Sequence, residues 1–324
     1  MKLALSLLLA SRLAASVAQA AEPAPDVARF VTLGTGGGPV IRVKRSEPAN
    51  AVVAGGSVYL FDVGDGVQRQ LAAARLPLAS VRAIFISHHH MDHNQGLGPL
   101  MMSRWLFDPL PAIPVIGPPG TRAMVSGLAA ANQATANAPI TVGGPPAPPV
   151  EATVKAVDLP PVLDVPTEIY RDDKVRVLAI GVDHFHLPTG MALDPAPRSY
   201  AFRIETQGRV FVFTGDTGPS ERLETLARGA DVLVSEVVNL DAAAASFRRT
   251  LPPAAVAPLL AHLGQDHLTP EQVGRLAARA GVGEVVLTHL SPGGDDETDL
   301  SGYTAGIASV FKGKVVVAAD LDRF

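Results

Sequence analysis

The chain has 324 residues, and its 27 basic and 31 acidic side chains give a formal net charge of −4. Hydrophobic residues make up 47% of it, which excludes a wholly disordered chain and is ample for a large core. Because it has no cysteine, a disulfide scaffold, a thiolate zinc site and a cysteine nucleophile are all excluded.

Residues 1–20 have the pattern of a cleaved export signal. Lys2 gives a positive start, residues 3–10 are apolar, and residues 18–20 (AQA) fit a small-x-small cleavage site. The apolar run is too short to span a bilayer of roughly 30 Å. We therefore expect residues 1–20 to be a signal peptide and residues 21–324 to form one domain. The mature protein would be periplasmic or secreted, with no membrane anchor; the alternative is an N-terminal helix of the fold.

Short β-type runs alternate with helical patterns along the rest of the chain. Strands are expected at residues 30–33, 51–53, 58–61, 83–86, 174–182, 200–205, 210–213, 232–234, 284–288 and 315–318. Helices are expected at residues 67–74, 121–131, 220–227, 270–280 and 303–311. This alternation predicts a layered α/β fold. The early strands lie close together, with Gly55-Gly56 as a hairpin turn, so a mixed sheet is expected.

Two stretches rich in glycine or proline show neither the helical nor the strand pattern. Residues 123–150 carry no charge, and their second half, residues 139–150, reads as a loop or semi-rigid linker. Residues 34–39 (GTGGGP) follow a strand but match neither the dinucleotide fingerprint nor the Walker pattern. A tight backbone turn is therefore expected there.

Four of the nine histidines fall within six residues. Residues 88–93 (HHHMDH) directly follow a buried-strand pattern, and imidazole and carboxylate groups crowded at a strand end suit zinc or a similar metal. His88 and His90 can chelate one ion from the same side of an extended turn. Asp92 and His93 then reach a second ion as the chain enters a helix that begins at Asn94. The alternative is a chance polar loop.

The spacing His-x-His-x-Asp-His resembles the signature of the metallo-β-lactamase superfamily. Further matches follow in the family's order at residues 33–37 (LGTGG), 60–64 (LFDVG), 213–217 (FTGDT) and 287–291 (LTHLS). Residues 117–121 (GPPGT), 235–236 (SE) and 267–269 (HLT) resemble the ribonuclease Z and arylsulfatase-like branch. The resemblance implies a four-layer αβ/βα sandwich: two mixed β-sheets face to face, flanked by helices, with a metal site along one sheet edge.

The resemblance also implies a set of metal ligands. His88, His90 and His184 would hold one ion, Asp92, His93 and His289 the other, and Asp216 would bridge both. His186 is a rival to His184, because residues two apart share one face of an extended chain. Outside the family reading, His289 could be a hydrogen-bonded strand histidine and Asp216 a helix cap.

Three more residues are expected to support the reaction. Asp62 would orient a ligand histidine, unless it is a plain turn residue. His267 and Glu236 match positions that ribonuclease Z-like enzymes use for proton handling, whereas a structural reading makes His267 a helix N-cap. His89 is expected to point away from the metals, and His262 to be a surface residue.

The implied activity is that of a metal-dependent hydrolase. Two zinc ions, with manganese or iron as alternatives, would share a hydroxide that attacks an ester. A phosphodiester or aryl sulfate is the favoured substrate, and Asp92, His267 and Glu236 are the catalytic side chains. The alternatives are a β-lactamase or lactonase and, from another class, a non-catalytic metal-binding domain.

The partner expected from the sequence is a small-molecule ester. Removal of residues 1–20 leaves 25 basic against 31 acidic side chains, a net charge of −6. The stretch 123–150, where the long family form carries a basic RNA-binding arm, has no Lys or Arg to neutralise phosphates. No nucleic acid is therefore expected as a partner. Oligomeric state stays open, a homodimer included.

Overall fold

The computed structural model describes residues 27–106, 110–138 and 148–324. The expected signal peptide, residues 1–20, lies outside this part, as do residues 139–147 of the expected linker. No helix in the described ranges is both long and apolar enough to cross a membrane.

The first sheet has six strands in the order of the chain. They are β1 (Arg29–Gly34), β2 (Ala49–Ala54), β3 (Ser57–Val63), β4 (Val81–Phe85), β5 (Ile113–Gly117) and β6 (Val154–Asp158). The first three are antiparallel and the rest parallel, so the sheet is mixed as expected. The β2–β3 hairpin turns through Gly55 and Gly56, whose φ values of 55° and 76° suit a primed turn.

The second sheet has seven strands in the order β13-β12-β11-β10-β9-β8-β7. They are β7 (Thr167–Arg171), β8 (Val175–Val182), β9 (Ser199–Thr206), β10 (Val210–Phe213), β11 (Val232–Val238), β12 (Glu284–Ser291) and β13 (Lys314–Val317). Strands β7 to β10 are antiparallel, and β10 to β13 are parallel.

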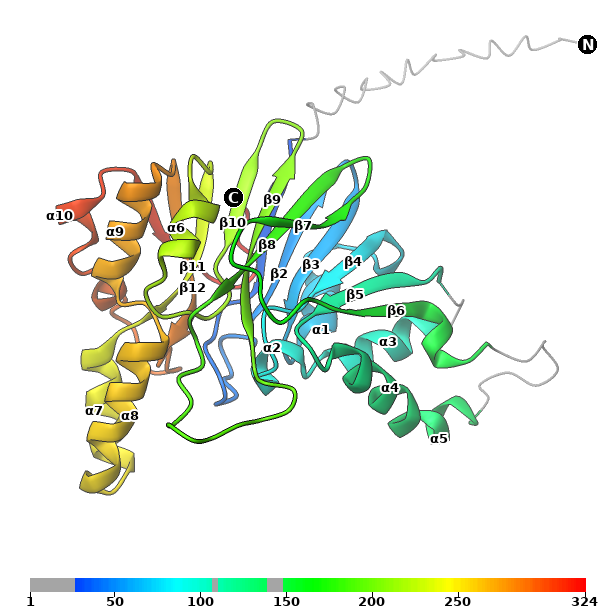
Figure 1. The fold of residues 1–324 in the computed structure, drawn as a ribbon, viewed down its shortest axis with the longest axis horizontal. Coiled ribbons are helices and arrows are strands. Elements are labelled where there is room, and N and C mark those ends of the chain that lie inside the picture. Colours follow the sequence, from blue (N-terminus) through cyan, green and yellow to red (C-terminus); the bar gives the residue numbers. More distant parts are fainter. Residues whose placement is uncertain (1–26, 107–109, 139–147) are drawn as a thin grey trace, which may run out of the picture.

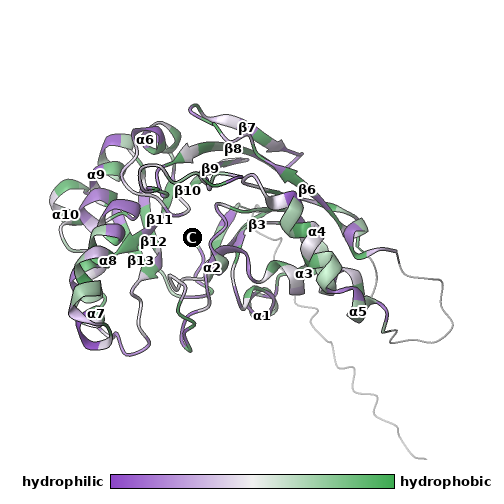
Figure 2. Ribbon diagram, turned by 60° about the horizontal axis from the view of Figure 1, so that its bottom comes forward, coloured by the Kyte–Doolittle hydropathy of each residue, from purple (hydrophilic) through white to green (hydrophobic). Residues whose placement is uncertain are grey.

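Helices cover the outer face of each sheet (Figures 1 and 2). The first sheet carries α1 (Val67–Ala73), α3 (Leu97–Leu106) and α4 (Thr121–Ala131), and the second carries α6 (Glu221–Ala227), α9 (Pro270–Ala280) and α10 (Ile307–Val310). Short α2 (Met91–Asn94) follows β4, and short α5 (Gln133–Ala136) follows α4. The pair α7 (Leu240–Thr250) and α8 (Pro253–Asp266) projects from the second half as a helical hairpin (Figure 1).

Three layers of buried side chains hold these four layers of structure together. One apolar cluster lies under each outer helical layer, and a third, rich in aromatic rings, lies between the sheets. In this middle cluster Phe61 stacks on Phe85 with ring centroids 4.8 Å apart, and Phe202 from the other sheet lies 5.7 Å from Phe61. The expected αβ/βα sandwich is therefore confirmed.

Several elements differ from the sequence expectation. Strands β5, β6 and β7 and helices α3, α7 and α8 were not expected; β5 contains Pro114, and the edge strand β7 lacks a strict polar–apolar alternation, because Ile169 and Tyr170 stand side by side between Glu168 and Arg171. The expected helix at residues 303–311 is broken, because Gly306 adopts a φ of 80° between a 3₁₀ turn and α10. The helix after the histidine motif begins at Met91 and not at Asn94.

Candidate metal centre

The proposed ligand residues meet where strands of both sheets end. His88 and His90 lie in the segment between β4 and α2, and His184 lies two residues beyond β8. Asp216 follows β10 by three residues, and His289 lies near the end of β12 with a φ of 44°. The packing of the two sheets thus brings together side chains from distant parts of the chain.

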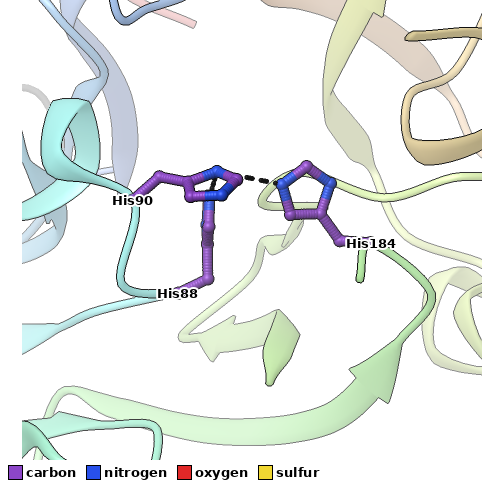
Figure 3. A group of neighbouring side chains, drawn as sticks. All are labelled: His88, His90 and His184. Atoms are coloured by element: carbon purple, nitrogen blue, oxygen red, sulfur yellow. Dashed lines mark hydrogen bonds between the residues drawn. The ribbon is translucent and has the colours of Figure 1, made fainter. Parts of the chain in front are cut away.

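The first group contains His88, His90 and His184, whose rings point toward one another from two separate segments (Figure 3). The Nδ1 atom of His90 lies 3.0 Å from Nε2 of His88 and 3.2 Å from Nε2 of His184. A tetrahedral zinc ion with bonds of about 2.0–2.1 Å places neighbouring nitrogens roughly 3.3 Å apart, so this spacing fits a shared ion.

Of the two rival histidines, the structure places His184 in this group. Its other ring nitrogen, Nδ1, donates to the backbone carbonyl of Asp266 at 2.8 Å, which fixes the ring's orientation. His186 instead turns its Nδ1 to the Asp266 carboxylate and takes no part in the group.

The second group contains Asp92, His93 and His289. Asp92 Oδ2 lies 3.5 Å from Nε2 of each histidine, and Asp216 Oδ2 lies 3.3 Å from His93 Nε2 and 3.0 Å from His289 Nε2. The same Asp216 oxygen lies 3.8 Å from Nε2 of His88 in the first group. Asp216 is therefore placed between the two groups.

Buried atoms with no hydrogen-bond partner test whether a metal fits here. Within the described residues, Nε2 of His93, Nε2 of His289 and Oδ1 of Asp216 are buried and unpartnered. Buried polar atoms are costly unless they are satisfied, and these three belong to residues whose ligand atoms lie close enough together to share a metal ion. The donor set of imidazole and carboxylate fits two divalent transition-metal ions.

The charges of the two groups also favour cations. Burial lowers the pKa of His184 to about 3, which keeps this imidazole neutral and ready to bind a metal. Burial also lowers the pKa of His289, but the Asp216 charge, with the Asp92 carboxylate also close to the ring, outweighs it and raises that pKa to about 10. The second group, with the carboxylates of Asp92 and Asp216 side by side, thus requires positive charge, which protons or a metal ion can supply.

Asp62 holds the histidine motif in place. Its Oδ1 accepts the Ser87 backbone N–H at 2.7 Å, and its Oδ2 accepts the Ser87 hydroxyl and His93 Nδ1–H, each at 2.7 Å. A carboxylate on Nδ1 leaves Nε2 to face a metal. The hydrogen bond expected between Asp62 and a candidate ligand histidine is present, and His89 turns away toward Thr121 and Asn94, as expected.

The glycine-rich turn after β1 packs directly against the second group. The backbone N–H of Gly38 donates to Asp92 Oδ2 at 2.9 Å. A Cβ on Gly38 would lie 2.3 Å from Asp92, and one on Gly37 would lie 2.9 Å from His289 Nδ1. The expected tight turn is present, and its glycines permit close approach to the candidate ligands.

His267 and Glu236 form a buried pair beside both groups. His267 Nδ1 donates to Glu236 Oε2 at 2.9 Å, and Glu236 Oε1 accepts the Thr217 and Leu268 backbone N–H groups, each at 3.1 Å. Burial opposes protonation of His267, but the Glu236 charge outweighs it and raises its pKa above the usual value. Thr269, with a capping box, is the N-cap of α9, so the reading of His267 as the cap is wrong.

Sequence reasoning missed Asp266. Its buried carboxylate lies between Nδ1 of His186 and Nδ1 of His262, while its carbonyl holds His184. His262, expected to be a plain surface residue, is half exposed and paired with this carboxylate. The i,i+4 spacing of His262 and Asp266 in a helix, directly before His267, is the signal that could have revealed the pair.

Comparison with known proteins identifies the family. A family model described as the beta-lactamase superfamily domain matches residues 58–290. The chain belongs to the metallo-β-lactamase superfamily. It is 33% identical over 310 residues to a protein named Ribonuclease Z from Mycolicibacterium paratuberculosis, which covers 90% of this chain and 96% of that protein. A protein of the same name from Mycolicibacterium gilvum is 31% identical over 304 residues, covering 90% and 94%.

Solved structures agree on the fold of this superfamily member. The Bacillus subtilis metallo-β-lactamase-fold protein YhfI matches with a TM-score of 0.64 and 19% identity, covering 92% of this chain and all of that one. Human tRNase Z, short form, matches with a TM-score of 0.60 and 21% identity, covering 91% and 98%. The family model and the relatives named Ribonuclease Z show that the chain is a hydrolase of the superfamily, and they confirm the resemblance to ribonuclease Z.

The expectation that no nucleic acid takes part is wrong. Relatives matching along nearly their whole length are named Ribonuclease Z, and structural neighbours are tRNase Z and a long-form RNase Z from yeast. Net charge sums over the entire chain, whereas a substrate responds to the local field, which bound metal ions dominate. The acidity of the chain therefore gave no valid ground for excluding RNA.

Proposed function

We propose that the protein is a binuclear metal-dependent phosphodiesterase of the ribonuclease Z type. The observation that carries the proposal is the position of Asp216 between two groups of candidate ligands. His88, His90 and His184 would hold one ion, and Asp92, His93 and His289 the other. Zinc suits the tetrahedral spacing of the first group, while manganese and iron accept the same donor types.

The metals would supply a strongly nucleophilic water at neutral pH and neutralise charge on the phosphoryl oxygens. The chain's own part begins with Asp92, whose carboxylate is held in the second group by a hydrogen bond from the Gly38 amide. Glu236 binds Nδ1 of His267 and stabilises the imidazolium, so that Nε2 can donate a proton to the leaving oxygen. The hydrogen bonds to Glu236 from two backbone amides keep this pair rigid.

The substrate proposed is a phosphodiester, with RNA within its scope because of the names of the relatives. The two groups alone do not distinguish a phosphodiester from an aryl sulfate, a lactone or a β-lactam. The ribonuclease Z relatives favour the phosphodiester over these alternatives.

Metal analysis and a substrate panel test the proposal. Zinc-loaded protein should contain two ions per chain and hydrolyse bis(p-nitrophenyl) phosphate or a precursor transfer RNA. Asp216→Ala should weaken metal binding in both groups, while Asp173→Ala, an exposed carboxylate in the β7–β8 turn, should leave it unchanged. A single ion, or hydrolysis confined to sulfate esters, lactones or β-lactams, contradicts the proposal.

We further propose that residues 1–20 are a cleaved leader and that residues 21–324 are the periplasmic or secreted hydrolase domain. The pattern of Lys2, the apolar run and residues 18–20 supports this. N-terminal sequencing of the exported protein should begin near Ala21. An intact Met1 on the exported form contradicts cleavage.

A further inference from the structure

A cavity of about 900 Å³ opens over the candidate metal centre. Its floor contains His90, Asp92, Asp216, His267 and His289. Its walls come from the segment after β1 and from the α7–α8 hairpin, and they are largely apolar. The apolar side chains of these walls include Val40, Ile41, Phe247, Leu251, Leu259 and Leu263. The volume lies within the usual range of small-molecule sites.

The wall formed by α8 has an unusual composition for an exposed helix. Between Pro253 and Gln265 it has no Asp, Glu, Lys or Arg, although most of these residues are partly or fully exposed. Solvated helices ordinarily carry charge on their outer face. Across the cavity, Val40 and Ile41 are 64% and 67% exposed. Apolar side chains exposed on both sides of a reactive centre indicate that an apolar group binds between them.

The charged groups of these walls already have partners. Arg42 donates to the backbone carbonyls of Gly37, Val40 and Pro292. Asp295 accepts the backbone N–H groups of Val43 and Lys44, each at 2.8 Å. These bonds fix the shape of the mouth and leave the apolar side chains as the surface offered to a ligand.

We propose that this cavity binds an aromatic ring carried by the phosphodiester next to its scissile phosphate. Phe247, half-buried in α7, would contact the ring, with Leu259 on the same wall and Ile41 opposite. This inference rests on the proposed function, because the metals must hold the phosphoryl group at the floor. The ring can be an aryl group or a nucleobase, since both present a flat, weakly polar face.

Binding is tested first, with ligands that cannot be hydrolysed. Diphenylphosphinate and dimethylphosphinate share the anionic group and differ only in the rings. Titration calorimetry of the zinc-loaded protein should show that diphenylphosphinate binds about 5- to 150-fold more tightly, the range for stacking one ring. Phe247→Ala should remove most of this difference and leave dimethylphosphinate binding and metal content unchanged.

A second cavity variant and a control variant distinguish loss of ring binding from misfolding of the protein. Leu259→Ser changes an exposed position and should act in the same direction as Phe247→Ala. Leu193→Ala, which changes another exposed leucine, outside the cavity, should have no effect. Equal binding of the two phosphinates by the wild-type protein, or equal losses for both in the cavity variants, overturns the inference.

Turnover then identifies the source of the ring and separates the two proposals. Phenyl p-nitrophenyl phosphate, methyl p-nitrophenyl phosphate and thymidine 5′-p-nitrophenyl phosphate share one leaving group. Phe247→Ala should raise KM for the phenyl ester if the ring is an aryl group, and for the thymidine ester if it is a nucleobase. Loss of discrimination in binding contradicts the cavity inference even where all three esters are hydrolysed. Absence of turnover with discrimination intact contradicts only the proposed function.

Discussion

His267 is held at 2.9 Å by Glu236 and faces the candidate metal centre without belonging to either of the two main ligand groups. His267→Ala should therefore keep the metal content near that of the wild type. Turnover of alkyl phosphodiesters should fall about 10²–10⁴-fold, because a proton donor to the leaving oxygen is lost. The loss should be much smaller with p-nitrophenolate, which leaves without a proton. Metal analysis and steady-state kinetics on matched esters measure both quantities.

The control for this substitution is His262→Ala, since His262 is also an imidazole paired with a carboxylate but is half exposed. His262→Ala should change the turnover of alkyl and p-nitrophenyl esters by less than His267→Ala lowers the turnover of alkyl esters. Metal lost in step with activity in His267→Ala shows that His267 is a ligand. Full activity on alkyl esters shows that it is structural.

The hydrogen bonds to Asp172 predict that the free energy of unfolding depends on pH. Burial raises its pKa, but hydrogen bonds from Tyr59 and Tyr170 and from the Val175 and Lys174 amides outweigh this and lower it. A carboxyl with a lower pKa in the folded state stabilises that state above about pH 4, and the contribution is lost as the pH falls further. Because solvent screens this partly exposed carboxylate, Asp172→Asn should cost about 0.5–1 kcal/mol near pH 7 and less near pH 3.

Urea unfolding of wild type and variant between pH 3 and pH 7 measures this dependence. Asp173→Asn, the exposed neighbour in the same turn, is the matched control and should shift stability little. A destabilisation of Asp172→Asn that stays constant with pH shows that lost packing, and not the charge, is responsible.

At the scale of elements, the turn after β1 is expected to control the second ligand group. Gly38→Ala places a methyl group within 2.3 Å of Asp92, whose carboxylate already accepts the Gly38 amide at 2.9 Å. The variant should fold but bind its second metal ion at least 10-fold more weakly, because Asp92 must move. Chelator competition measures this affinity. Gly127→Ala in α4 is the control, since nothing lies within 4 Å of its added Cβ.

A fall in affinity confined to one of two ions is the expected signature of Gly38→Ala. Unchanged affinity for both ions would show that the turn can shift to accept the methyl group. Loss of both ions together would show that the turn supports the whole centre and not Asp92 alone.

At the scale of the molecule, the candidate ligands join the two sheets. The histidine motif follows β4 of the first sheet, while Asp216 and His289 come from β10 and β12 of the second. Metal bound only by the folded state stabilises it by about 2.7 kcal/mol at 100 times Kd. Chelation should therefore lower Tm by several degrees and make it depend on zinc concentration.

Calorimetric scans with and without EDTA measure this shift. Asp216→Ala should abolish most of it, whereas Asp173→Ala should retain it. A Tm that is the same with and without chelator contradicts a centre that links the sheets.

The sequence by itself determined the features that depend on neighbouring residues. His88, His90, Asp92 and His93 share one turn, so their convergence at a strand end follows from local backbone geometry. The Gly55-Gly56 hairpin and most strands of both sheets followed from turn chemistry and periodicity in the same way. The order of the family motifs then indicated the sandwich, because motif order is preserved along the chain.

The tertiary structure decided what depends on residues distant in the chain. Two-residue periodicity left His184 and His186 equivalent. Only the tertiary structure, which brings the last residue of α8 to the segment after β8, shows that the Asp266 carbonyl binds His184 and the Asp266 carboxylate binds His186. Helix α8 of the cavity wall escaped prediction because its prolines and alanines show little amphipathic contrast. Composition reports a sum over the chain, whereas ligand choice and the surface offered to substrate depend on which side chains the two sheets bring within a few ångströms.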